Sequence, residues 1–321
     1  MSPVKGIAIV MPARNAAATI VRSLRSVLAE PEVTEVIVID DGSQDGTGDL
    51  ARSLGDARLR VIAGPAQGIA AALNAGILAA QAPYVARCDS DDTYVPGRLA
   101  GQLAFLETHP DYVAISTGFA SVDRKGRHLA DLATRLPEGE VTGRLRAGQV
   151  LTHLCTWLIR REALGALGGA RPWFETAEDV DLQFRLAGLG RVWHRPEVGY
   201  LYLLHEASIV HRSRAERLAF FDKAARDFAL ERATGGTDAL ERGCPPQKPV
   251  PQEAGQGILS DQITGHLTGQ AWYDFSIGHR RAALARMIRA IRHAPLRRDL
   301  WQGLMVMVVK MLISSIGGKK K

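Results

Sequence analysis

Short apolar runs alternate with helix-like stretches through the first hundred residues of the chain. Four runs are nearly continuous in apolar residues and are predicted as strands: residues 6–12, 33–41, 59–62 and 84–89. Apolar residues recur at helical spacing over 19–29, and an Ala-rich helix is predicted before the fourth run. Strands that are apolar throughout are buried on both faces, so the alternation predicts an α/β fold with a doubly wound, mostly parallel sheet.

The regular alternation ends near residue 100. Residues 152–164 are expected to begin as a strand and end as a helix. Residues 233–257 contain four prolines and many glycines, which is typical of a linker, and helices are predicted at 272–293 and 300–316. The expected organisation is a main domain, a linker and a basic C-terminal helical region: residues 1–232, 233–258 and 259–321.

The basic charge of the chain is concentrated near its end. Of the total net charge of +6, residues from 270 onward supply eleven Lys and Arg against two Asp, a net +9, so the first 269 residues carry −3. A nucleic-acid function of the main domain therefore has no support from charge. Three scattered cysteines without CxxC spacing argue against a structural zinc site and indicate a reducing compartment. We see no signal peptide and no apolar run of about 18 residues.

Polar motifs follow three of the predicted strands: Ala13-Arg14-Asn15, Asp40-Asp41-Gly42-Ser43 and Asp89-Ser90-Asp91-Asp92. In a parallel sheet the C-terminal ends of the strands meet at one edge, where ligands bind. The GxGxxG fingerprint of dinucleotide-binding proteins is absent, so a dinucleotide is not favoured.

The cluster of Asp89, Asp91 and Asp92 places like charges close together. Carboxylates at a strand end are the ligands that Mg²⁺ or Mn²⁺ prefers, and one or two suffice when phosphate oxygens and water complete the shell. The alternative is a solvated acidic turn that precedes a helix near Pro96.

Two further acidic motifs have similar alternatives. Asp40 and Asp41 are suited to accept hydrogen bonds from a base or ribose, but such residues also form turns. Glu178 and Asp179 lie where a loop enters a helix, and a carboxylate there is suited to be a general base. The alternative is that they only complement the helix dipole.

The ordered set of motifs resembles the family 2 glycosyltransferases of GT-A fold, bacterial in type. The matching pieces span about residues 5–212 and are, in chain order, IAIVMPARNAAATI, VIVIDDGSQDGT, GIAAALNAGI, YVARCDSDDTYVPGRL, LIRREALGALGG, FETAEDVDLQFRLA and LLHEAS. The resemblance implies a GT-A domain with a C-terminal helical extension. Its nucleotide-binding half covers about residues 1–110 and its acceptor half about 111–232.

The resemblance also implies roles for single residues. Asp89-Ser90-Asp91 resembles the DXD motif, which holds a divalent cation, Mn²⁺ or Mg²⁺, against a nucleotide diphosphate, and Asp179 matches the catalytic base. The residues implied in nucleotide binding are Pro12, Arg14, Asn15, Asp40, Asp41 and Ser90. His205 and Ser208 match an HxxS motif whose histidine approaches the diphosphate or the metal, with a packed histidine as the alternative.

Some positions depart from the family pattern. Leu73 stands where many relatives have Arg, which puts one contact with the diphosphate in doubt, and Leu204 stands where Arg commonly precedes the HxxS motif. The QxxRW motif of processive polysaccharide synthases is not met, because Gln183 and Arg185 have the wrong spacing and Trp193 is too distant. A polymer-extruding synthase is therefore not expected.

The implied reaction is metal-dependent and moves a sugar, with a UDP-sugar favoured as donor, to an acceptor hydroxyl with inversion. The expected acceptor is a carbohydrate or lipid-linked molecule of cell-surface polysaccharide or glycolipid assembly. A sugar nucleotidyltransferase is one alternative, although its Gly-rich basic loop after the first strand is absent. A non-catalytic nucleotide-sugar-binding module is the other, although such a module has no need of a base.

The basic tail has two interpretations. Residues 304–316 are apolar almost all round, but Lys310 interrupts them and they are too short to span a bilayer. Residues 280–321 are predicted either to contact an anionic membrane surface or to pack as a helical subdomain. The expected location is cytoplasmic, at the inner face of the membrane in the first case.

Overall fold

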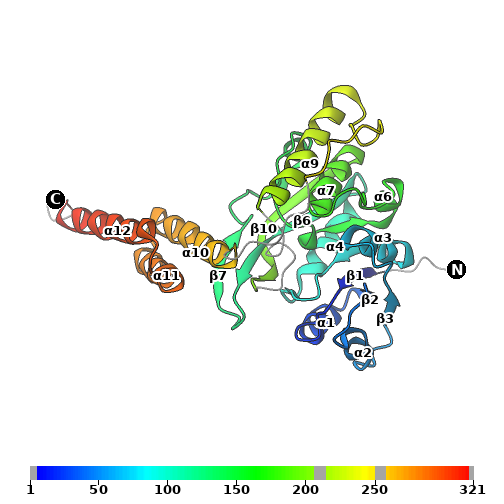
Figure 1. Cartoon of the computed structure of the whole chain (residues 1–321), viewed down its shortest axis with the longest axis horizontal. Helices are drawn as coiled ribbons and strands as arrows, with labels where there is room; N and C mark the ends of the chain where they lie inside the picture. Colours follow the sequence, from blue (N-terminus) through cyan, green and yellow to red (C-terminus); the bar gives the residue numbers. More distant parts are fainter. Residues whose placement is uncertain (1–5, 206–214, 250–257, 318–321) are drawn as a thin grey trace. The chain divides into compact units, whose positions relative to one another are not determined.

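The computed structural model of the protein describes residues 6–205, 215–249 and 258–317, which form two compact units (Figure 1). Among these residues, unit 1 consists of 6–119, 132–202 and 215–249. Unit 2 consists of 120–131, 203–205 and 258–317. The C-terminal helices therefore share a unit with a segment from the middle of the chain, which the sequence pattern did not indicate.

The sheet is mixed, with the order β3-β2-β1-β4-β9-β6-β10-β5, and with β7 beside β6 and β8 beside β10. The strands are β1 Ile7–Ala13, β2 Val33–Asp40, β3 Leu59–Ala63, β4 Tyr84–Arg87, β5 Thr93–Tyr94, β6 Tyr112–Val122, β7 His128–Leu132, β8 Gly139–Glu140, β9 Leu158–Arg160 and β10 Arg191–Leu203. The pairs among β3, β2, β1 and β4 are parallel, whereas β9 pairs antiparallel with both β4 and β6. The expected parallel arrangement therefore applies to the first four strands, and an antiparallel part follows them.

Helices cover both faces of the sheet in unit 1. They are α1 Ile20–Leu28, α2 Thr47–Arg52, α3 Ile69–Ala79, α4 Arg98–Thr108, α5 Thr142–Arg146, α6 Arg161–Ala166, α7 Glu178–Leu189 and α9 Ala215–Gly235, with a 3-10 turn η1 at Leu154–Thr156. In β1, Ile9 packs into the core on the α1 side and Val10 into the core on the α3 side. A Cβ on Gly76 of α3 would come within 2.3 Å of Val10, so only glycine lets this helix approach the sheet so closely.

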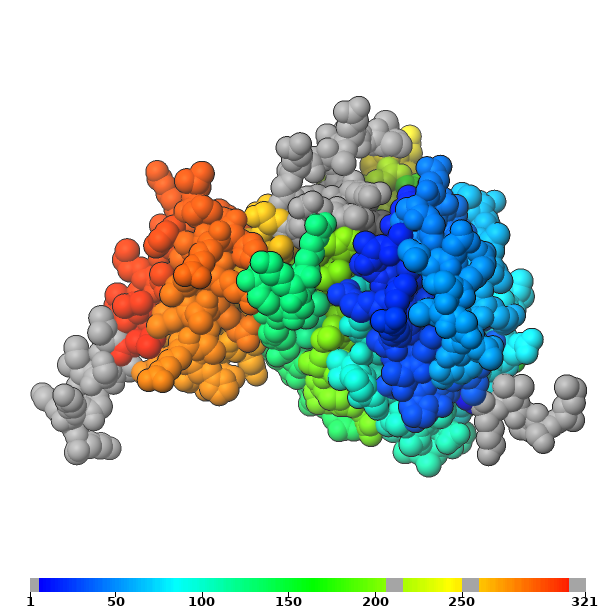
Figure 2. Space-filling view, turned by 90° about the horizontal axis from the view of Figure 1, so that it is seen from below, coloured from blue at the N-terminus to red at the C-terminus, as the bar shows by residue number. Residues whose placement is uncertain are grey.

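Unit 2 has a core of its own. Its helices are α10 Ile258–Ser276, α11 Arg280–His293 and α12 Arg298–Gly317, and α11 packs against both of the others. Leu267, Met287 and Met307 are fully buried. The guanidinium of Arg289 donates to Asp123 (3.0 Å), which ties α11 to the 120–131 segment. In Figure 2 the orange and red atoms of these helices form one continuous mass.

Two further features bear on the expected organisation. Asp238 lies inside the expected linker but is fully buried and bonded to Arg171, so the first part of that segment is packed on unit 1. Within the described ranges, no helix combines the length and the apolar character that crossing a membrane requires.

Candidate active site

The three predicted polar motifs lie together at the C-terminal edge of the parallel strands. β1 pairs with β2 so that Ala13 lies opposite Asp40, and with β4 so that Val10 lies opposite Arg87. Beyond the strand, the amide of Asp41 still donates to the carbonyl of Ala13 (2.9 Å). The parallel register thus gathers the residues that the sequence pattern singled out.

The first two loops are joined to each other. The amide of Asn15 donates to Ser43 Oγ (3.0 Å), and Asn15 Oδ1 accepts from the amide of Gln44 (2.9 Å). Asn15 has a φ of +52°, a left-handed conformation that asparagine tolerates better than most residues. Pro12 is buried in β1, whereas Arg14 is exposed and has no ion pair with any residue in the described ranges. Asn15 therefore shapes the loop, and Arg14 remains available for a ligand.

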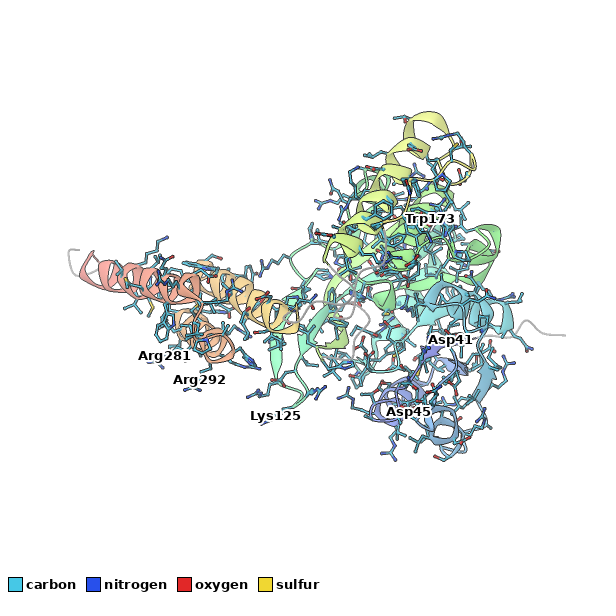
Figure 3. All side chains as sticks on the ribbon, viewed as in Figure 1. Asp41, Asp45, Lys125, Trp173, Arg281 and Arg292 are labelled. Atoms are coloured by element: carbon cyan, nitrogen blue, oxygen red, sulfur yellow. The ribbon has the colours of Figure 1, made fainter. Side chains whose placement is uncertain are left out.

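Asp40 and Asp41 both hold backbone in place. Asp40 Oδ1 accepts from the amide of Ser43 (3.0 Å), and its other carboxylate oxygen lies 2.5 Å from the position that a Cβ on Gly48 would occupy. Asp41 is buried, and its Oδ1 accepts from the amide of Ala66 (2.6 Å) in the loop after β3. Figure 3 labels Asp41 at this edge. Asp40 therefore forms the turn after β2, and Asp41 holds the loop after β3.

The carboxylates of the acidic cluster have different surroundings. Asp92 is buried and accepts from the hydroxyl of Tyr200 (2.7 Å), and that hydroxyl accepts from the amide of Asp89 (3.2 Å). Asp89 and Asp91 are only partly buried. Asp92 therefore stabilises the loop, and the other two carboxylates are the ones suited to face a ligand.

Helix α1 fixes the backbone of the same loop. Ser23 Oγ donates to the carbonyl of Ser90 (3.0 Å), and the guanidinium of Arg22 donates to the carbonyl of Asp91 (2.7 Å). The side chain of Ser90 is half-buried. These bonds set the direction in which residues 89–91 present their side chains.

Arg87 connects the acidic cluster to the start of α7. Its Nε donates to Asp89 Oδ1 (2.6 Å), and its Nη1 donates to Glu178 Oε1 (3.0 Å). The Arg87 and Glu178 side chains are 10% and 6% exposed, so both bonds lie in a poorly hydrated setting, where they are strong. Burial, followed by the neighbouring carboxylate of Asp179, raises the pKa of Glu178 to about 7, against the opposing effect of Arg87.

Asp179 lies in the first turn of α7 next to Glu178 and is partly exposed. Its charge also contributes to the raised pKa of Arg87, after the larger opposing effect of burial and the charges of Asp89, Cys155 and Glu178. The predicted metal motif and the predicted base are therefore neighbours of a single arginine. No pattern in the sequence indicated that Arg87 joins Asp89 to Glu178.

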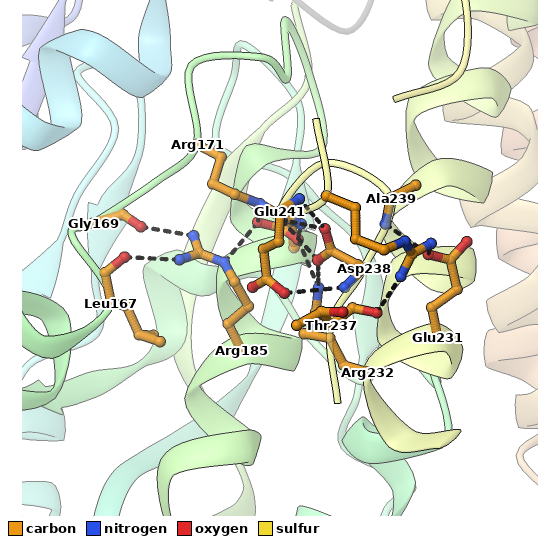
Figure 4. A network of polar contacts seen from close by, with 12 residues as sticks. Leu167, Gly169, Arg171, Arg185, Glu231, Arg232, Thr237, Asp238, Ala239 and Glu241 are labelled. Atoms are coloured by element: carbon orange, nitrogen blue, oxygen red, sulfur yellow. Dashed lines mark hydrogen bonds and ion pairs between the residues drawn. The ribbon is translucent and has the colours of Figure 1, made fainter. Parts of the chain in front are cut away.

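A buried polar network anchors α7 two residues beyond Asp179. Asp181 is fully buried and accepts from Arg171 Nε (2.9 Å) and Arg185 Nε (2.8 Å). Arg171 also donates to Asp238 (2.7 Å), which pairs with Arg232 of α9 as well. Figure 4 shows Arg171 and Arg232 at Asp238, and Arg185 bonded to the carbonyls of Leu167 and Gly169. The network fixes the position of the helix turn that carries the predicted base.

An aromatic group lies beside the acidic cluster. The His153 ring lies 5.1 Å from the Tyr202 ring and 5.3 Å from the Phe119 ring, measured between centroids. Burial, with the nearby carboxylates of Asp92 and Asp91, raises the pKa of Tyr202. His153 and Tyr202 are partly exposed, and such surfaces are typical of small-molecule sites.

The candidate third metal ligand lies at the margin of the described residues. His205 follows β10 and is half-buried, and Ser208 lies outside the described residues. Within those ranges no group of three or more His, Cys, Asp or Glu side chains could hold a metal ion. Asp89 and Asp91 supply hard oxygen donors, a set that fits Mg²⁺ or Mn²⁺ sharing its shell with water and phosphate oxygens.

Several residues of the site were missed at the level of sequence, although signals existed. Arg87 is a charged residue in an otherwise apolar strand, and a buried charge requires a partner. Tyr200 and Tyr202 alternate along β10, so they share one face of the sheet. No sequence signal identified the contact between His153 and Tyr202, which lie 49 residues apart.

The model of the family described as "Glycosyl transferase family 2" matches residues 8–168. The chain is 46% identical over 116 residues to the succinoglycan biosynthesis protein ExoU of Rhizobium meliloti, a match that covers 35% of this chain and 33% of ExoU. It is 31% identical over 217 residues to the putative glycosyltransferase EpsE of Bacillus subtilis, covering 65% of this chain and 76% of EpsE. It is 33% identical to the succinoglycan biosynthesis protein ExoO of R. meliloti, covering 68% and 66%.

The fold is similar to solved structures of S. aureus TarS. The TarS 1–349 complex with UDP-GlcNAc superposes with a TM-score of 0.60 at 16% identity, covering 90% of this chain and 82% of TarS 1–349. The complex with UDP gives a TM-score of 0.58 at 17% identity, covering 98% and 92%.

Proposed function

The chain belongs to glycosyl transferase family 2, and on that basis we propose that it transfers a sugar from a nucleotide diphosphate donor to an acceptor hydroxyl. The family and the fold class predicted from the sequence are confirmed. One observation carries the proposal: Arg87 bonds to Asp89 and Glu178 at once. An acidic loop and a partly exposed carboxylate therefore flank one site.

The donor is assigned to the edge formed by the first two loops. The base and ribose contact Pro12, Asn15 and Asp40, with Asp41 supporting the loop, and the exposed Arg14 and Ser90 complete the nucleotide site. A UDP-sugar is the favoured donor, because the similar TarS structures contain UDP-GlcNAc and UDP.

Asp91 and Asp89 are the residues that would hold Mn²⁺ or Mg²⁺, with water and phosphate oxygens completing the shell. When bound, the cation neutralises the charge that develops on the departing diphosphate. Arg87 keeps one oxygen of Asp89 engaged, which leaves the second oxygen for a cation.

Asp179 is assigned as the general base. It accepts the proton of the acceptor hydroxyl as that oxygen bonds to the anomeric carbon and the bond to the diphosphate breaks, which inverts the configuration there. Glu178 and Arg87 orient the helix turn that carries Asp179. The partly exposed pair His153 and Tyr202 provides a surface on which a sugar ring can pack.

The acceptor is assigned to the carbohydrate or lipid-linked class. ExoU and ExoO are named for succinoglycan biosynthesis, which favours a role in the assembly of cell-surface polysaccharide or glycolipid. The match covers a third of ExoU and about two thirds of ExoO, so their names support the reaction class and leave the individual sugar open.

A panel of nucleotide sugars, incubated with Mn²⁺, Mg²⁺ or chelator, tests the proposal. We expect release of a nucleoside diphosphate from one donor, dependent on a divalent cation and accelerated by the matching acceptor. Release of inorganic pyrophosphate from a nucleoside triphosphate and a sugar phosphate would instead identify a nucleotidyltransferase. Tight nucleotide binding with no release on any donor and acceptor would identify a binding module.

A further inference from the structure

Helix α12 presents an exposed apolar face. Trp301, Met305 and Val309 follow one another at four-residue spacing, and 51%, 66% and 47% of their surfaces are exposed. Side chains four residues apart lie on the same side of a helix. The opposite side is packed, with Leu300 and Met307 buried in the core of unit 2. A continuous apolar row is unusual on a water-facing helix, where single exposed apolar residues are the norm.

Exposed basic residues accompany this face. Arg298 precedes Trp301 by one turn, Lys310 follows Val309, and both are exposed. Neither has an ion pair with a residue in the described ranges. Basic side chains at the ends of an apolar row are able to keep their charges in a polar layer while their stems lie along apolar surface.

Helix α11 carries two further arginines that have no ion pair with any residue that the structure describes. Arg281 and Arg292 are exposed and project from the same side of the helix (Figure 3), with the 42% exposed Ile288 one turn from Arg292. By contrast, Arg286 and Arg289 on the same helix pair with carboxylates. The unpaired charges are thus separate from those that stabilise the unit.

We propose that the exposed face of α12, with the basic residues beside it, binds an anionic lipid surface. An apolar row with flanking cations is the composition of helices that lie in the plane of a membrane interface. The charge of this region favours binding to an anionic lipid surface over binding to a second copy of the chain. Residues from 270 onward carry a net charge of +9, which repels an identical face and attracts acidic headgroups.

The two interpretations of the basic tail then apply to different sides of one helix. The side with Leu300 and Met307 packs within unit 2, and the side with Trp301 and Met305 contacts lipid. A chain held in this way has access to an acceptor that is itself anchored in the bilayer.

Co-sedimentation of the full chain with vesicles of phosphatidylcholine, with and without phosphatidylglycerol, tests the inference. We expect binding that requires phosphatidylglycerol and is reversed by high salt. The double variant Met305→Asp and Val309→Asp should bind at least about tenfold more weakly, because charges enter the apolar row. Arg281→Glu with Arg292→Glu should also weaken binding to the anionic vesicles.

Leu78→Asp is the matched control, since Leu78 is 88% exposed on α3 of unit 1 and should leave vesicle binding unchanged. Melting curves and nucleotide release with a soluble acceptor should be the same for all variants. The inference is overturned if the parent chain ignores phosphatidylglycerol or if the double variant sediments normally. It is also overturned if light scattering shows self-association that the double variant abolishes. Loss of nucleotide release in every protein, with lipid binding intact, would count against the proposed reaction alone.

Discussion

Arg87 places a positive charge at the end of an otherwise apolar strand. It is held there by two carboxylates, Asp89 in the loop after β4 and Glu178 at the start of α7, which would repel each other without it. Removing a carboxylate from water costs free energy, and each bond from Arg87 offsets part of that cost for its partner. The residue is therefore a positioning residue for both halves of the site.

Substitution of Arg87 by Met should strongly destabilise the chain. The change keeps the length of the side chain but leaves Glu178 unpaired in a buried setting, so we expect the free energy of unfolding to fall by about 3–5 kcal/mol. Urea denaturation measures the effect. Arg87→Lys retains the charge but not the two donors that reach both carboxylates, so its free energy of unfolding should fall by less. Arg60→Met, which removes a pair between the exposed Arg60 and the partly buried Glu35, is the control and should cost about 1 kcal/mol or less. Equal losses in Arg60→Met and Arg87→Met would contradict the argument.

Asp179→Asn tests the assignment of the base. The variant should lower kcat by a factor on the order of 10² to 10⁴, because the acceptor hydroxyl keeps its proton, while donor affinity stays nearly unchanged. Initial rates and calorimetric titration with the nucleotide separate the two quantities. A collapse of nucleotide affinity with normal single-turnover chemistry would remove Asp179 from this role.

The raised pKa of Glu178 makes stability depend on pH. In the folded chain this carboxyl group, which faces Arg87 and Asp179, has a pKa of about 7, above its ordinary value of 4.5. The folded state then binds more protons than the unfolded state between these values. The free energy of unfolding, relative to Glu178→Gln, should therefore fall by on the order of a few kcal/mol as pH rises through this window. Denaturation of both proteins in chelator across the window measures it, and a difference that does not change with pH would rule the shift out.

At the scale of elements, α7 is the helix on which the site depends. Its first turn carries Glu178 and Asp179, and its position is set by Asp181, on which two arginines converge. A surface ion pair would not hold a helix in this way, because water competes for its partners. The position of α7 therefore depends on the buried network, which includes Arg232 of α9 and Asp238.

Asp181→Asn should show how far this anchoring matters. The variant leaves Arg171 and Arg185 without their shared anion in a buried setting, so we expect a loss of about 3–5 kcal/mol in the free energy of unfolding. Asp227→Asn on α9, whose partner is the exposed Lys223, should cost about 1 kcal/mol or less. Thermal denaturation of the pair gives the comparison. Similar melting temperatures for the two variants would mean that the network adds little.

Sequence periodicity predicted β1, β2 and β4 because they are largely buried, and it predicted the edge strand β3 although that strand is only partly buried. Residues such as Ile9 and Val10 pack into separate cores, so no polar position interrupts the run. The strand expected within 152–164 is present as β9, but its antiparallel pairing with β4 and β6 was not predicted, and β8, with two residues, is too short to show a period. Their pairing depends on partners that are distant in sequence.

The candidate site shows the same division at the scale of the whole molecule. The acidic motifs could be predicted, since strand ends in a parallel sheet share an edge. The sequence could not predict that Asp92 is buried while Asp89 and Asp91 are partly exposed, because this depends on Tyr200, which lies more than a hundred residues away. The bond between Arg87 and Glu178 likewise spans 91 positions and leaves no local pattern.

Because unit 2 has a core of its own, we expect that weakening this core leaves the reaction of unit 1 intact. Met287 is fully buried in its core, so Met287→Ala should destabilise this unit by about 2–5 kcal/mol. Nucleotide release with a soluble acceptor should persist. Met305→Ala on the exposed face of α12 is the matched control and should change stability by about 0.5 kcal/mol or less. Calorimetry and activity assays on both variants separate these results. Parallel loss of activity and stability in Met287→Ala would contradict this expectation.

The Asn15 amide donates to Ser43 Oγ and the Gln44 amide donates to Asn15 Oδ1, and these two bonds join loops that follow two different strands. A ligand at this edge meets a surface whose shape is established during folding, so little chain entropy remains to be lost when it binds. An altered residue in one loop would disturb the other, and relatives with a new donor preference should differ at both. Specificity in this lineage would then diverge by paired replacements rather than by gradual single changes.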